Sequence, residues 1–139
     1  MTLIEKLRQN RPVLLYGLTP PRLSKSPEEV RQIAARQLAR LANARFDGLV
    51  IYDLQDESDR ASERPFEFSG CYAPERYWRE FLGAPCDAVI YKAISQLRTA
   101  ELADFMSAVA PNAAVFVGAA SSKPPSKPHS RRHTSSNAR

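Results

Sequence analysis

The densest group of residues that could do chemistry follows an apolar run near the middle of the chain. The segment YDLQDESDR (residues 52–60) brings carboxylates, an amide and a guanidinium close together. Asp53, Gln55 and Asp56 could accept or donate hydrogen bonds to the hydroxyl groups of a cofactor, and Arg60 could hold a phosphate. A solvated loop whose charges pair locally at i and i+4 explains the same residues. Both interpretations stay open.

Lys92 is the second candidate, because it lies in a later apolar run, DAVIYKAI (residues 87–94). Its ammonium group could point into the mouth of a barrel and face an anionic ligand. It could instead extend along the sheet edge toward solvent. Alternation along a strand does not decide which way it points. The residues SSK (121–123), after the last apolar run, could donate to phosphate, but such short runs are common.

Several well-known catalytic patterns are absent from the full sequence. It has no GxGxxG, GxxxxGK[ST], GxSxG or HExxH motif, and the two cysteines form no CxxC pair. Both histidines lie near the end of the chain, at His129 and His133. Nucleoside-triphosphate loops, hydrolase triads and zinc sites therefore lose most of their support.

The charge of the chain is concentrated at its end. The net charge of +5 comes from residues 121–139, which hold no acidic residue and five basic ones: Lys123, Lys127, Arg131, Arg132 and Arg139. This Ser/Pro-rich tail is predicted to be disordered. It could attract polyanions, but it lacks aromatic residues for base stacking, so nucleic acid is not the expected partner. We expect a cytoplasmic protein, without a signal peptide or an apolar run long enough to span a membrane.

The body of the chain alternates apolar runs with helical patterns. Strands are expected at 13–18, 47–54, 87–94 and 113–120, and helices at 26–43, 74–82 and 99–110. This βαβαβαβ order predicts an α/β fold with a parallel sheet. The sheet could be open and doubly wound, or it could be the N-terminal half of a TIM-type barrel, about four βα units. Residues 1–120 would form this partial barrel domain and 121–139 the tail.

Four segments, taken in order, resemble one enzyme family. LLYGLTPPR (14–22), DGLVIYDLQDESDR (47–60) followed by RPFEF, DAVIYKAI and AAVFVGAASS (113–122) are together similar to the methylenetetrahydrofolate reductase family, over about residues 10–122. The resemblance implies a flavin-containing barrel of one-carbon and methionine metabolism. There FAD, reduced by NADH or NADPH, would pass a hydride to methylenetetrahydrofolate. The candidate cofactor contacts are Thr19, Tyr52, Asp53, Gln55, Asp56 and Lys92.

Two places depart from the pattern of that family. One lies at the end of the last apolar run, where the resemblance implies an acidic group near the flavin and this chain has Gly118, Ala119 and Ala120. At the other, the resemblance places a proton-transferring glutamate just before the Pro-Pro loop, where this chain has Gly17. A glycine cannot act as a general acid. We expect a truncated N-terminal part of a longer enzyme. The tail is either a natural flexible segment or the product of a frame shift or an early stop that replaced the remainder.

Three hypotheses about function follow. The first is a reductase-like flavin oxidoreductase that acts on a folate-type substrate. The second is a non-catalytic fragment or pseudo-enzyme, whose exposed sheet edges would favour homo-oligomers. The third is a polyanion-binding module that works through the basic tail.

Overall fold

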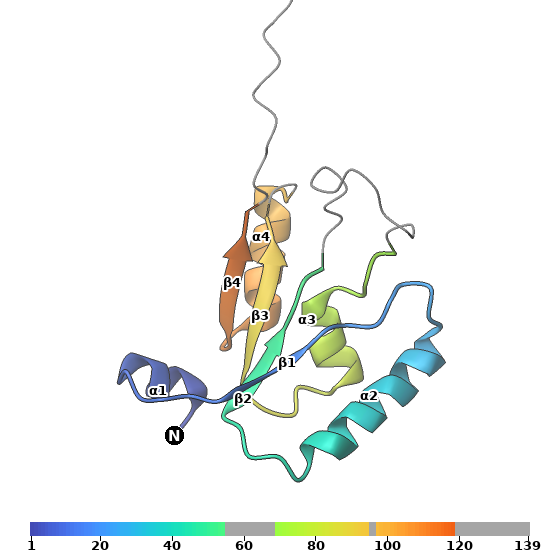
Figure 1. Ribbon diagram of the computed structural model, residues 1–139. Coiled ribbons are helices and arrows are strands. Elements are labelled where there is room, and N and C mark those ends of the chain that lie inside the picture. The colour runs from blue at the N-terminus through green and yellow to red at the C-terminus, as the bar shows by residue number, and fades with distance from the viewer. Residues whose placement is uncertain (55–68, 95–96, 119–139) are drawn as a thin grey trace, which may run out of the picture.

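The computed structural model describes residues 1–54, 69–94 and 97–118, and these contain one four-stranded parallel sheet. Its strands are β1 (Leu15–Leu18), β2 (Gly48–Ile51), β3 (Ala88–Ala93) and β4 (Ala113–Val117), and they lie side by side in chain order (Figure 1). A doubly wound sheet reverses its strand order at a switch point, whereas a barrel adds each strand next to the last. The order β1-β2-β3-β4 is therefore that of a partial α/β barrel, one of the two architectures that the sequence allowed.

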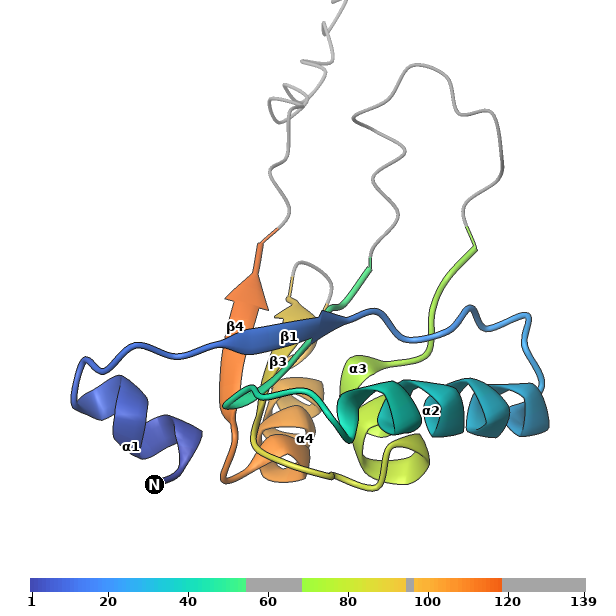
Figure 2. The same ribbon diagram turned by 60° about the horizontal axis from the view of Figure 1, so that its bottom comes forward.

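Three helical segments cover one face of this sheet. They are α2 (Pro27–Leu41), α3 (Pro74–Arg76), which continues into the π-helical turn η2 (Tyr77–Phe81), and α4 (Thr99–Val109). Figure 2 shows them together below the strands. The main core lies between them and the sheet, and its largest members include Leu49, Ile51, Ile90, Tyr77, Trp78 and Phe105. This is the layer that surrounds the outside of a barrel.

The helix α2 begins as the sequence predicts. The Ser26 hydroxyl accepts from the Glu29 N–H at 3.2 Å, and Oε2 of Glu29 accepts from the Ser26 N–H at 2.9 Å. Together with Pro27 at the first helical position, this reciprocal pair satisfies free donors of the first turn. The helix ends at Leu41, slightly before the expected Asn43.

The opposite face of the sheet has two different halves. Its N-terminal half packs against α1 (Leu3–Arg8), whose buried Leu3 forms a second, smaller core with Val50 and Val89. Its C-terminal half is far more exposed: Tyr52 is 40% accessible and Val117 is 43% accessible. We call this C-terminal half the open face. It is formed by Gly17, Tyr52, Tyr91, Val115 and Val117.

Some details differ from the sequence-based expectations. The expected helix 74–82 is one short α-helical turn followed by a π-helical turn. Thr99 is the first helical residue of α4, and the N–H of the preceding Arg98 donates to Glu101. On α4, Met106 is 45% exposed, whereas Phe105 and Val109 are buried. Within the described ranges, no helix is both long enough and apolar enough to cross a membrane.

Candidate functional site

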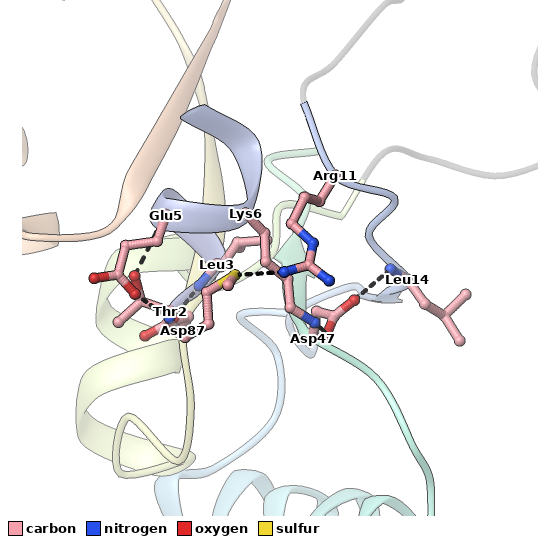
Figure 3. Close-up of polar contacts among 9 residues, drawn as sticks. Thr2, Leu3, Glu5, Lys6, Arg11, Leu14, Asp47 and Asp87 are labelled. Carbon is pink, nitrogen blue, oxygen red and sulfur yellow. Dashed lines mark hydrogen bonds and ion pairs between the residues drawn. The ribbon is translucent and has the colours of Figure 1, made fainter. Parts of the chain in front are cut away.

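The helix α1 is held at the N-terminal ends of the strands. Two aspartates, each directly before a strand, hold it (Figure 3). Oδ2 of Asp87 accepts from the Leu3 N–H at 2.7 Å, while Asp47 pairs with Lys6 and accepts from the Leu14 N–H at 2.9 Å. These bonds, first that from Lys6, hold the pKa of the Asp47 carboxyl below its usual range. Contacts with α1 occupy this end of the sheet, so we expect a ligand site at the opposite end.

At the C-terminal ends of β2 and β3, a cavity of about 530 Å³ opens on the side of the helices. Its lining carries charges of both signs and one thiol: Asp53, Cys71, Arg76, Lys92 and Glu101. Burial raises the pKa of the Cys71 thiol, which keeps it protonated near neutral pH and makes it a poor nucleophile.

Two predicted site residues in this cavity make contacts within the protein. Nζ of Lys92 lies 2.9 Å from Oε1 of Glu75 and 5.4 Å from the centre of the Phe105 ring, and only 15% of the lysine side chain is exposed. Lys92 therefore faces the helices rather than the open face. Oδ2 of Asp53 accepts from the Ala93 N–H at 2.8 Å, which ties the end of β2 to β3. Both residues nevertheless border the cavity.

The other predicted residues lie apart from this pair. Thr19 is exposed, just after the end of β1. Gln55 and Asp56 fall outside the described residues, as does the tail 121–139. Tyr52 lies on the open face.

On the open face, Tyr52 lies between Gly17 and Tyr91. A Cβ atom added to Gly17 would meet Cε2 of Tyr52 at 2.8 Å and its hydroxyl oxygen at 3.1 Å. The ring centroids of Tyr52 and Tyr91 are 5.2 Å apart, and their planes are inclined at 57°. The phenol of Tyr52 thus fills the space in which a side chain at position 17 would begin.

Tyr91 was missed by the sequence analysis, although a signal for it exists. Side chains alternate along a strand, and Ile51 pairs with Ile90, so Tyr52 and Tyr91 fall on the same face at the same level. That deduction needs the strand register, which one sequence does not supply.

The open face and the cavity offer different chemical groups to a ligand. Among the described residues, no group of three His, Cys, Asp or Glu side chains is placed to hold a metal ion. The open face offers aromatic rings and phenol hydroxyls, and the cavity offers mixed charge. Flat, partly polar small molecules fit this combination.

Comparisons with known proteins give one informative likeness. No model of a protein family and no curated protein matches the chain. Among solved structures, it is similar to an uncharacterized protein from Clostridium thermocellum that binds two copies of 5-methyl-5,6,7,8-tetrahydrofolic acid. The TM-score is 0.68 and the sequence identity 27%, over 85% of this chain but only 38% of the other. This chain therefore corresponds to well under half of that protein.

Proposed function

We propose that this chain binds a reduced folate, with 5-methyltetrahydrofolate as the representative ligand. The likeness to the folate-binding protein from Clostridium thermocellum carries this proposal, since it combines a shared fold with 27% identity. Because the match covers 38% of that protein, the chain would supply part of such a site.

The placement of the exposed groups supports the same conclusion. Parallel α/β barrels bind their ligands at the C-terminal ends of the strands. In this chain those ends carry the cavity and the open face, while α1 blocks the N-terminal ends. A reduced folate joins a pterin, in which the pyrimidinone ring is planar and the tetrahydropyrazine ring is saturated, to an aminobenzoyl group and an anionic glutamate. Such a ligand can use aromatic and charged groups together.

Calorimetric titration of the purified 139-residue chain with 5-methyltetrahydrofolate tests the proposal. We expect saturable binding and a rise in the unfolding temperature that grows with ligand concentration. Aminobenzoylglutamate, which lacks the pterin ring, serves as the control ligand and should bind more weakly. Absence of saturable binding up to about 1 mM, an affinity limit of roughly −4 kcal/mol, would overturn the proposal.

A second candidate is flavin-dependent hydride transfer to methylenetetrahydrofolate. The ligand of the Clostridium thermocellum protein favours it, because a 5-methyl group is what hydride reduction of a bridging methylene leaves behind. The ordered segments that resemble the methylenetetrahydrofolate reductase family point the same way.

The residues present fit a flavin poorly, so no reaction step through FAD follows from them. Gly17 offers no acid, and the ammonium of Lys92 is engaged by Glu75. FAD and NAD(P)H remain predictions, and the visible spectrum of the purified chain tests them. A flavin absorption band that persists after gel filtration would support this candidate, and a colourless folded protein that takes up no added FAD would refute it.

A further inference from the structure

We infer that Tyr52 and Tyr91 form the stacking site for the pterin ring of the reduced folate. This inference rests on the proposed function and adds the place and manner of recognition. It locates the ring on the open face rather than in the charged cavity beside the helices.

The exposure of Tyr52 is the first observation. Every residue of β2 is buried, yet the tyrosine that follows the strand is 40% exposed. Val115 and Val117, on the same face, are also exposed. A group of exposed apolar side chains beside an aromatic ring is typical of a ligand-binding surface.

The geometry of the tyrosine pair is the second observation. A Cβ added at Gly17 would meet the hydroxyl-bearing end of the Tyr52 ring, namely Cε2, Cζ and the hydroxyl oxygen. The ring of Tyr91 is tilted by 57° at a centroid distance of 5.2 Å, so the two rings are not stacked face to face. With 40% of Tyr52 exposed, this side chain still offers surface to a further ring at ordinary stacking distance.

The backbone holds this pair in place before any ligand arrives. The Tyr52 N–H donates to the Leu18 carbonyl at 3.0 Å, and Ile51 pairs with Ile90 directly below the two tyrosines. The side chain of Leu3 fills the same face at the N-terminal half. A ring on the open face therefore meets an ordered platform, which lowers the entropic cost of binding.

The cavity beside the helices is less suited to the ring. Its basic groups are engaged by acids: Lys92 by Glu75, and Arg76 by Glu80 at 2.7 Å. A largely uncharged pterin gains little from such pairs and would have to displace them. The phenol hydroxyl of Tyr52, in contrast, can donate to or accept from the nitrogen-rich edge of the ring.

Alanine variants test the stacking site by titration with 5-methyltetrahydrofolate. Tyr52→Ala and Tyr91→Ala should each raise the Kd roughly 5- to 150-fold, the range that loss of an aromatic stacking partner gives for nucleobases. Tyr52→Phe keeps the ring and should retain most of the affinity. Tyr16→Ala is the matched control, because Tyr16 is similarly exposed but lies against Phe46 on the helix-covered face. It should leave the Kd within about twofold.

A second measurement uses only the wild-type chain, so it stays informative even if the alanine variants fail to fold. In saturation-transfer NMR with the wild-type chain, the pterin protons should receive more magnetisation from the protein than the aminobenzoyl protons. Wild-type affinity in both alanine variants, or a ligand contact made mainly through its aminobenzoyl end, would overturn the stacking site and leave the proposed function standing. A wild-type chain that binds no folate would overturn both.

Discussion

Replacing Gly17 with alanine should move one aromatic ring without unfolding the protein. The added Cβ would lie 2.8 Å from Cε2 of Tyr52, whereas ordinary van der Waals contact begins at 3.4 Å. The atoms it meets belong to the far end of a side chain, so the Tyr52 ring can swing away while the backbone stays in place. Gly17→Ala should therefore move the Tyr52 ring on the open face and leave the rest of the fold unchanged.

The effect on stability is small because two terms oppose each other. Forcing a side chain about 30° from its preferred rotamer costs about 0.5–1.5 kcal/mol. Removing a glycine from a strand stabilises the fold by roughly 0.5–1 kcal/mol, because the unfolded chain has less conformational freedom. The free energy of unfolding of Gly17→Ala should therefore lie within about 1 kcal/mol of the wild type. Its affinity for 5-methyltetrahydrofolate should fall by about fivefold or more, because the ring platform has moved.

Gly48→Ala is the matched control, because its added Cβ meets atoms that cannot swing away. That Cβ would lie 2.7 Å from the backbone oxygen of Asp87 and 3.0 Å from Cδ2 of Leu3. Overpacking of this kind costs about 1–3 kcal/mol, while the folate affinity of the folded fraction should be retained. Urea unfolding followed by circular dichroism gives the stabilities, and calorimetry gives the affinities. The reasoning is refuted if Gly17→Ala loses as much stability as Gly48→Ala, or if it binds folate as the wild type does.

Three further predictions concern the rest of the fold. Since the pKa of Asp47 is lowered in the folded state, its ionised form stabilises the fold above pH 3.8, and this contribution is lost as the pH falls through the folded pKa. The stability difference between wild type and Asp47→Asn in urea should therefore narrow below pH 3.8. A double-mutant cycle of Lys92→Met and Glu75→Gln should give a coupling energy of about 0.5–3 kcal/mol; additive effects would contradict the pairing. No described strand pairs with the outer edges of β1 and β4, so light scattering should show concentration-dependent association of the isolated chain.

The elements of the fold could be predicted because their causes are local. The Ser26–Glu29 capping box lies within four residues of sequence, and the run Gly48–Ile51 is apolar because both faces of β2 are covered. The choice between an open sheet and a barrel could not be predicted with the same certainty. It depends on where each crossover places the next strand, which is a property of tertiary packing.

The site could be predicted only in part, because neighbouring residues of a strand point to opposite faces of the sheet. Lys92 and Tyr91 are neighbours in sequence, yet Lys92 points to Glu75 among the helices and Tyr91 lies on the open face with Tyr52. A shift of one position exchanges the two faces completely. Strand ends could therefore be named as the site, but the partners of each side chain required the register.

Gly17 and Gly48 play similar structural roles in the sheet. Both lie on the face opposite the main helices, and each leaves room for a side chain from another element: Tyr52 beside Gly17, and Leu3 against Gly48. At position 17, a side chain and the observed placement of Tyr52 exclude each other. A glutamate there would bring an acid but displace the tyrosine, so the identity of residue 17 and the placement of Tyr52 depend on each other. The absence of a side chain at position 17 is thus what allows Tyr52 to lie beside Tyr91 in its observed place.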